Sequence, residues 1–369
     1  MKTETCRKCQ MTINDLYDDK KNKLCIFHCD KTNWYVYCGD EKIWDEKKVD
    51  YFWQVIRSEK MQKSDFNFNK YIFPSCQKVR EDRVKLRGSG RYIAQETFDF
   101  WEKGEEVCFD NEVDFHRAIF LGKAGFIGTR FFQCSDFSGV EFADEIVFLW
   151  SYFLKKANFG YATFKKTFYS EIIFREEISF EKATFFHRVI FEDNSGGHST
   201  IPEFDFSRVV FPNGTLFRNV NLSKTQFQYA YLNDVLFQEC IFKIDESDEF
   251  GIIGDECKLN EELKGKMQCK SDKDKIRMIR GLSSIESIYI QLKKNFENKG
   301  EYYQASDFYL GEMRMRKKRL FIQNDRRIER AVIKLYEFIS NFGEDPVRII
   351  EFLFIVIFLC WYIWVIVNI

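Results

Sequence analysis

The chain has 369 residues, with 56 Lys and Arg against 57 Asp and Glu, so its formal net charge is -1. This balance excludes a strongly basic nucleic-acid binder and an acidic, disordered chain. Phenylalanine is abundant, at 41 residues, whereas proline is rare, at 4. The composition therefore excludes collagen-like or linker-like material, and it predicts an architecture that buries aromatic rings at regular intervals.

The first segment, residues 1–45, is rich in cysteine and lacks the apolar run of a secretory signal. We therefore expect a cytosolic, reducing compartment, where clustered cysteines more often bind metal than form disulfides. Cys6 and Cys9 form one close pair, and Cys25 and His28 form a second one 15 residues later. Each pair can sit on one tight turn and supply two corners of a tetrahedral site.

This spacing predicts that Cys6, Cys9, Cys25 and His28 bind zinc, with Cys29 as the alternative fourth ligand. The role would be structural, because four protein ligands leave no open position for water. The other interpretation is a small loop of free, reduced cysteines. Residues 46–97, with aromatic runs at 51–53, 66–68 and 72–74, are predicted to form a small helix and extended segments that cap or link to the next domain.

Residues 98–243 contain a register of large apolar residues, mostly Phe, from Phe109 to Phe191 and again from Phe206 to Phe242. The steps are five, or alternately five and six, and Tyr169 takes one of the positions. A small or β-branched residue, such as Ala118 or Val209, lies two residues before most members. Positions five apart on a helix are about 140° apart and share no face. In a strand, an odd step reverses the side chain.

The register fits short extended pieces joined by corners, with positions i-2 and i both facing inward. Four corners return the chain above its starting point, which gives a coil of about 20 residues. We interpret the sixth residue of the longer steps as a bulge at one corner. Asp193–Pro202 interrupts the register and is predicted to form a loop.

Segments such as Ala157–Tyr161, Ala162–Lys166 and Ala230–Asp234 resemble the pentapeptide-repeat family. The resemblance implies a mainly β fold, a right-handed quadrilateral β-helix over residues 98–243. The Cys-Ile-Phe-His run at 25–28 is similar to a zinc-knuckle-like element found ahead of some pentapeptide-repeat domains.

Residues 244–275 are predicted to be a linker, and residues 276–345 a helical hairpin followed by a basic amphipathic helix. A first helix ends at Gly300 and a second extends from Tyr302 to about Phe321. The first buries one face, made of Ile285, Ile288, Tyr289, Leu292 and Phe296. A third helix, with Ile328 and Leu335 on one face, follows a stretch of net charge +6 over residues 312–334. It is either packed with a solvated basic face or bound at the surface of an anionic membrane.

Residues 346–369 are predicted to be a transmembrane segment. Ile349–Val367 contains a single charged residue and is about 28 Å long as a helix, close to the thickness of a bilayer core. Arg348 and the preceding basic residues keep the bulk of the chain in the cytoplasm under the positive-inside rule. A buried core helix, or a homo-oligomer formed through this segment, would also cover its apolar surface.

The turn Asn341–Pro346 resembles the entry to the membrane part of pentapeptide-repeat proteins fused to a two-helix, ion-channel-like domain. In such proteins a pore loop and a second span follow, whereas this sequence ends at Ile369. It is therefore expected to be a tail-anchored protein, or a truncated or split member of that group.

No arrangement of residues predicts catalysis, because His116, His187 and His198 are isolated within or beside the repeats. We expect a non-enzymatic, membrane-anchored cytoplasmic scaffold that binds a protein partner. The alternative is the cytoplasmic regulatory part of a channel-like protein. A DNA mimic that regulates a topoisomerase is less favoured, because residues 109–242 carry 17 acidic and 13 basic residues, a weak excess. No nucleic-acid partner is expected.

Overall fold

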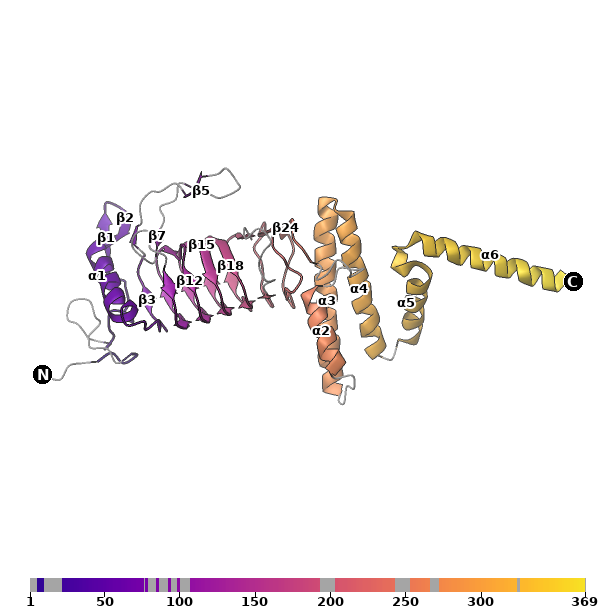
Figure 1. Ribbon diagram of the computed structural model, residues 1–369, viewed down its shortest axis with the longest axis horizontal. Helices are drawn as coiled ribbons and strands as arrows, with labels where there is room; N and C mark the ends of the chain where they lie inside the picture. Colours follow the sequence, from indigo (N-terminus) through magenta and orange to yellow (C-terminus); the bar gives the residue numbers. More distant parts are fainter. Residues whose placement is uncertain are drawn as a thin grey trace. The chain divides into compact units, whose positions relative to one another are not determined.

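The computed structural model describes residues 5–9, 22–75, 77–78, 84–85, 92–93, 98–99, 107–192, 203–242, 253–265, 272–323 and 326–368 (Figure 1). The chain divides into two compact units, Met1–Phe242 and Lys243–Ile369, which are described separately. The predicted loop at Asp193–Pro202 lies outside the described residues.

The first unit begins with small elements around helix α1 (Glu46–Ile56). Asp45 caps this helix, and Val49, Phe52, Trp53 and Ile56 are its buried face. The Trp53 indole N–H donates to the Ser75 carbonyl at 3.0 Å, so α1 is held over the first turn of the following β structure. The neighbouring elements are the antiparallel pair β1 (Tyr35–Cys38) and β2 (Glu41–Trp44), and the π-helical turn η1 (Arg57–Met61).

The body of this unit is a β-solenoid of about five turns, built from three parallel sheets (Figure 1). The first sheet comprises β3 (Ile72–Phe73), β10 (Ile119–Phe120), β14 (Glu141–Phe142), β17 (Thr163–Phe164) and β20 (Thr184–Phe185). The second comprises β9 (Val113–Asp114), β13 (Ser135–Asp136), β16 (Ala157–Asn158), β19 (Ile178–Ser179) and β22 (Phe204–Asp205). The third comprises β8 (Cys108–Phe109), β12 (Arg130–Phe131), β15 (Ile146–Phe153), β18 (Phe168–Phe174), β21 (Val189–Glu192), β23 (Leu216–Arg218) and β24 (Leu236–Gln238), and β11 (Ala124–Gly125) also pairs with β15.

Phenylalanine rings stack in columns along the inside of the solenoid. Phe115, Phe137 and Phe159 are fully buried, and their successive ring centroids lie 4.8 and 4.7 Å apart. This distance equals the spacing of neighbouring strands, so the parallel ladder itself sets the stacking. The small or β-branched residues that lie two positions before the central residues of the register are buried as predicted, except that Cys240 is only half-buried. The buried ones are Val113, Ala118, Ala124, Ala157, Ala162, Ala183, Val209, Thr225, Ala230 and Val235.

The stack begins upstream of the predicted repeat. Phe68 stacks on Phe115 at 4.8 Å, and Phe73 on Phe120 at 4.4 Å. β3 pairs with β10, so part of the segment predicted as a cap forms the first turn. Two antiparallel pairs lie between this turn and the next, β4 (Gln77–Lys78) with β7 (Phe98–Asp99), and β5 (Val84–Lys85) with β6 (Tyr92–Ile93).

The two step lengths make different corners. Between Phe109 and Phe164, each five-residue step turns through one residue with a positive φ: Arg117, Gly128, Gly139, Trp150 and Tyr161. The six-residue steps of this range contain no such residue and turn through bends. A sixth residue gives the backbone enough length to turn with negative φ. The predicted bulge in the longer steps is therefore wrong, and the register shift that the structure records, between Leu149 and Ser151, lies in a five-residue step.

One position in the predicted register is also wrong. Phe168 is buried, and it pairs with Ile146 and Val189, which occupy the inward i-2 position of their turns. Tyr169 pairs with Val147 and thus lies at an outward register position. The step of five from Phe164 points to Tyr169, but β18 pairs Ser170 with Phe148 and Phe191. The central register position therefore lies one residue later than predicted, and Phe168 takes the inward i-2 position.

The second unit is helical. Its helices are α2 (Gly254–Gly265), α3 (Asp272–Lys299), α4 (Tyr302–Gln323), α5 (Arg327–Ser340), the 3-10 turn η2 (Asn341–Gly343) and α6 (Pro346–Asn368). α2 lies in the segment predicted as a linker, and its Glu256 is buried. The predicted face of α3 is confirmed, because all five of its residues are buried. Gly300 ends this helix with a φ of 78°.

The basic residues of α4 are largely paired with acidic residues. Glu256 pairs with Arg314 and Lys318, and Glu286 pairs with Arg316 and Arg319. In addition, Lys317 pairs with Glu337. These acids lie outside residues 312–334, so the count of +6 overstated the positive charge on α4. Of these paired basic residues of α4, Arg316 is exposed and the others are half-buried. Arg327 and Lys334 of α5 are exposed.

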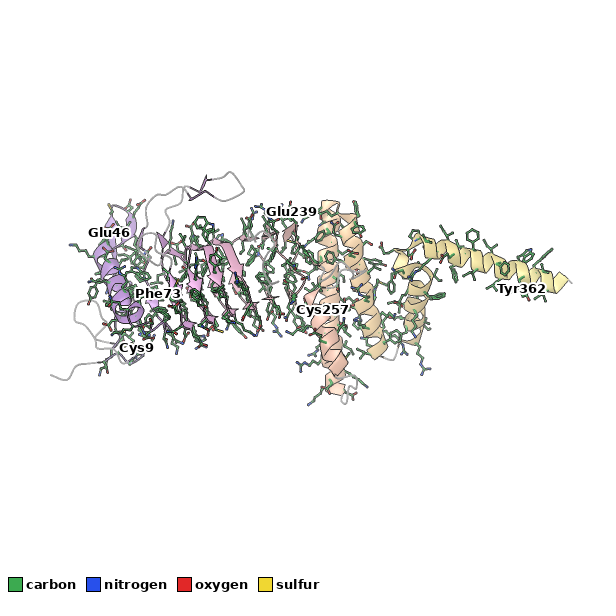
Figure 2. All side chains as sticks on the ribbon, in the orientation of Figure 1. Cys9, Glu46, Phe73, Glu239, Cys257 and Tyr362 are labelled. Atoms are coloured by element: carbon green, nitrogen blue, oxygen red, sulfur yellow. The ribbon has the colours of Figure 1, made fainter. Side chains whose placement is uncertain are left out.

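α6 is long and apolar enough to cross a membrane, with a mean hydropathy of 2.6 over Pro346–Ile366. No part of that window is buried in the protein. Figure 2 shows side chains projecting on all sides of this helix, Tyr362 among them. The alternative of a buried core helix therefore does not hold for these residues in this structure.

Candidate metal centre

A tight turn brings the two predicted ligand pairs together. The backbone N–H groups of His28 and Cys29 both donate to the Cys25 carbonyl at 2.9 Å, which places Cys25 and His28 on one side of the turn. The backbone N–H of Arg7 donates to the Lys23 carbonyl at 3.0 Å. This bond holds the segment with Cys6 and Cys9 beside the turn.

The four predicted ligand atoms of Cys6, Cys9, Cys25 and His28 lie within 4.8 Å of one another. The Cys25 Sγ is 3.4 Å from the Cys9 Sγ and 3.4 Å from the His28 Nδ1, and the Cys6 Sγ is 3.8 Å from that nitrogen. In a tetrahedral zinc site, bond lengths of about 2.3 Å to sulfur and 2.0–2.1 Å to nitrogen separate the ligand atoms by about 3.5–3.8 Å. The cluster could therefore bind a metal ion with little rearrangement.

Cys29 lies outside this cluster. Its thiol is 3.5 Å from the Ile26 carbonyl, and the Lys31 ammonium donates to its sulfur at 3.2 Å. Lys31 is fully buried and also donates to the carbonyls of Ile26 and Cys29. This ammonium also lies 4.6 Å from the Trp34 ring centroid, so it links the turn to Trp34. His28 rather than Cys29 completes the group.

The turn docks on the first strand of the solenoid. The Ile72 N–H donates to the Phe27 carbonyl at 2.8 Å, and the Phe27 ring stacks on Tyr71 with centroids 4.6 Å apart. The His28 ring meets the same tyrosine edge-on at 5.0 Å. The cluster thus fixes the N-terminal segment to β3. The sequence did not single out Lys31 or Tyr71, because neither belongs to a ligand spacing.

A close contact and burial disfavour ionisation of the Cys25 thiol in the cluster. A hydrogen bond with Cys9, followed by burial, raises the pKa of the Cys25 thiol above its ordinary value. Burial, followed by the nearby thiols of Cys9 and Cys25, also raises the pKa of Tyr71. Metal binding requires thiolates, so it must release protons from the cluster and weaken as the pH falls.

Comparisons of this chain with protein-family models, with curated proteins and with solved structures find no match. The resemblance to pentapeptide repeats therefore stays a prediction. The structure itself shows a β-solenoid, a Cys/His cluster near the N-terminus and one apolar helix at the C-terminus.

Proposed function

We propose that this protein is a membrane-anchored, non-enzymatic scaffold whose solenoid is a right-handed quadrilateral β-helix of the pentapeptide-repeat type. A solenoid followed by one helix that could span a bilayer is the observation that carries the proposal. A core of stacked phenylalanines is rigid, and each turn contacts only its neighbours, so outward positions can vary to suit a partner.

α6 supplies the anchor. A helix of this length crosses the hydrocarbon core, and its exposed side chains would meet lipid on every side. Arg348 precedes the apolar stretch and pairs with Asp345 at 3.0 Å. With the basic residues on the N-terminal side of the span, the solenoid faces the cytoplasm.

The outer face of the first sheet supplies the surface for a protein partner. Thr184, Val210 and Tyr231 are in register on successive turns, and Val210 and Tyr231 are exposed. Phe186 follows β20 and is 61% exposed, although an aromatic side chain of this size is usually buried. Apolar side chains on a rigid sheet are typical of a binding surface.

The metal in the Cys/His cluster is structural zinc. The distances match tetrahedral coordination by three sulfurs and one imidazole nitrogen, which zinc favours. When bound, the ion would crosslink the N-terminal segment to the turn that docks on β3. Tyr71 would restrict the rotation of the His28 ring.

Photo-crosslinking in the membrane fraction tests the scaffold function. A photoreactive amino acid at position 210, in the full chain, should give a discrete adduct that persists after a carbonate wash. Phe186→Glu should abolish the adduct, whereas the same probe at position 108, which is exposed on the third sheet, should give none. Equal adducts at both positions, or none at either, would contradict a partner site on this face.

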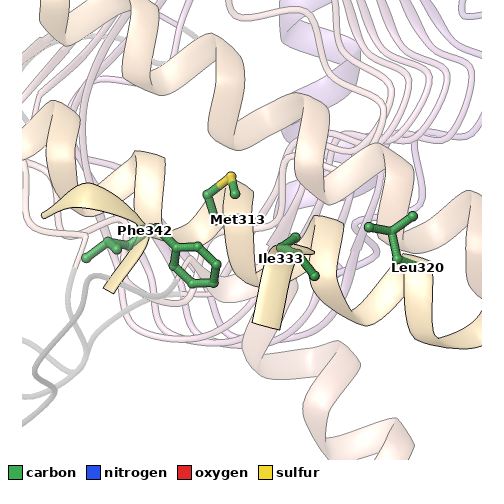
Figure 3. Close-up of a cluster of buried hydrophobic side chains, with 5 residues drawn as sticks. Met313, Leu320, Ile333 and Phe342 are labelled. Atoms are coloured by element: carbon green, nitrogen blue, oxygen red, sulfur yellow. The ribbon is translucent and has the colours of Figure 1, made fainter. Parts of the chain in front are cut away.

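The regulatory part of a channel-like protein is the second candidate. The turn that leads into α6 buries Phe342 in a cluster with Leu310, Met313, Leu320 and Ile333 (Figure 3). The helical hairpin is therefore packed directly against the start of the span, as a relay between cytoplasm and membrane requires.

A further inference from the structure

Helix α5 is attached to α4 by one face. Ile333 is buried and belongs to the cluster with Leu320 and Phe342, and Figure 3 shows it beside Met313 and Leu320 of α4. The Lys317 ammonium on α4 also pairs with Glu337 on the same side of α5. This side of the helix is therefore fixed to the hairpin.

The opposite face of α5 is apolar and exposed. Ile328 is 80% exposed and Phe338 72%, and Val332 and Leu335 are more than half exposed. Ile328, Val332 and Leu335 follow the i, i+4, i+7 spacing of a continuous helical stripe. Single exposed apolar residues are common on protein surfaces, whereas four large ones on one helical face form a continuous apolar patch.

Basic residues lie on one flank of this stripe. At about 100° per residue, Arg327 and Lys334 project on the side of Phe338, roughly a quarter turn from the centre of the stripe. Both residues are exposed, and the Lys334 ammonium lies 4.7 Å from the ring centroid of Phe321 on α4. An apolar face bordered by Lys and Arg is typical of helices that lie in the plane of a membrane surface.

The connection between α5 and α6 has a defined geometry. Asn341, Phe342 and Gly343 all have positive φ values, and Phe342 is buried. Asp345 then caps α6 by accepting from the backbone N–H groups of Val347 and Arg348, each at 3.1 Å. Figure 1 shows α6 leaving on the side of α5 that is turned away from α4. The apolar stripe thus faces the side on which the span extends.

We propose that α5 is an interfacial helix, with its apolar stripe inserted at the level of the lipid headgroups and with Arg327 and Lys334 bound to anionic lipid. This inference rests on the proposed membrane anchor, because α6 brings α5 to the bilayer. It gives the second unit two contacts with one membrane, a spanning one and a surface one. A second copy of the chain fits the stripe less well in an antiparallel symmetric pair, because that arrangement would bring the two basic flanks together.

The test uses the full chain in vesicles of phosphatidylcholine, with or without phosphatidylserine. A solvatochromic amino acid replaces Leu335 in one variant and Ile290 in a control. Ile290 is exposed on α3, which packs on α4. Carbonate extraction first establishes whether α6 is inserted. We then expect blue-shifted emission at position 335 and quenching by nitroxide-bearing lipid, whereas position 290 should be quenched by aqueous iodide alone.

The charge contribution is measured with Arg327→Gln combined with Lys334→Gln. In vesicles with phosphatidylserine, each of the two substitutions should lower the ratio of membrane-bound to unbound α5 by about fivefold. One basic residue near an anionic surface contributes about 1 kcal/mol. In phosphatidylcholine alone the double variant should match the parent. An equal effect in both lipids would overturn the anionic contact.

The outcomes separate this inference from the proposed function. Failure of the chain to resist carbonate would overturn both. An inserted chain whose probe at position 335 remains accessible to iodide would overturn the interfacial helix and leave the anchor intact. A blue shift that disappears on dilution of protein in lipid would show that a second copy covers the stripe, which also overturns the proposal.

Discussion

At the scale of single residues, the Cys/His cluster has a testable composition. Replacing Cys25→Ser removes the thiol that lies 3.4 Å from both Cys9 and His28, so bound metal should be lost. Cys29→Ser is the matched control, because Cys29 has the same burial but lies outside the cluster. Metal analysis of the purified full chain should give about one zinc per chain for the parent and for Cys29→Ser. Retention of zinc by Cys25→Ser would contradict the assignment.

Gly128 tests the corners of the solenoid. Its φ is 65°, and an added Cβ would meet no atom within 4 Å, so Gly128→Ala adds backbone strain without a clash. We expect a loss of about 1 kcal/mol in the free energy of unfolding, with a smaller loss for Gly128→Asn. Chemical denaturation followed by circular dichroism gives these values. Equal stability of the parent and Gly128→Ala would show that this corner does not need the left-handed conformation.

The sequence predicted which residues form the Cys/His cluster, because the short spacings typical of metal sites are visible in one dimension. It did not predict Lys31, whose importance comes from carbonyls and rings that only the folded turn assembles around its ammonium. The sequence also could not show that Phe168, rather than Tyr169, occupies an inward position. Both residues are aromatic, and pairing with the neighbouring strand decides between them.

At the scale of elements, the stacked columns should dominate the stability of the solenoid. Phe137 is fully buried and stacks on Phe115 and Phe159, so Phe137→Ala removes contacts on both sides. We expect a cost of about 3–5 kcal/mol from lost burial and the cavity. The exposed control Lys166→Ala should change the free energy of unfolding by less than about 0.5 kcal/mol. Similar costs at the two sites would contradict the inward register.

Close packing of α3 on α4 depends on Gly311. A Cβ on this residue would lie 2.2 Å from the Tyr289 ring, and that tyrosine is fully buried, with its hydroxyl donating to Glu256 at 2.6 Å. Gly311→Ala should therefore push the helices apart and cost about 1–3 kcal/mol. Thermal unfolding in detergent checks the value, with the exposed substitution Gln304→Ala as the control. An unchanged midpoint for Gly311→Ala would contradict this packing.

Periodicity predicted the solenoid and the helical hairpin, because the spacing of apolar residues directly reports the shape of the backbone. It could not show which corners use a left-handed residue, since residues as different as Arg117, Gly128 and Trp150 occupy them. Nor could it show that Glu256 and Glu286 neutralise α4. These acids are distant in sequence and meet the basic residues only after folding.

At the scale of the whole molecule, the chain consists of two units that differ in how they treat their apolar side chains. The solenoid unit buries most of its described phenylalanines, and the helical unit leaves α6 and one face of α5 exposed. Length and composition alone predicted a helix that could span a membrane, and α6 has that length and apolar composition. The exposure of the apolar face of α5 required the structure, because a helix of that composition could equally have packed with this face inward.

The central claim, a cytoplasmic solenoid anchored by α6, is tested most directly by the reactivity of native cysteines in cells. Cys134 is exposed on the solenoid and Cys360 lies within α6. A membrane-impermeant maleimide, read out by peptide mass spectrometry, should label neither in intact cells. It should label Cys134 once the plasma membrane is permeabilised, and Cys360 only after detergent dissolves the bilayer. Labelling of Cys134 in intact cells, or of Cys360 together with Cys134 before detergent is added, would contradict the account.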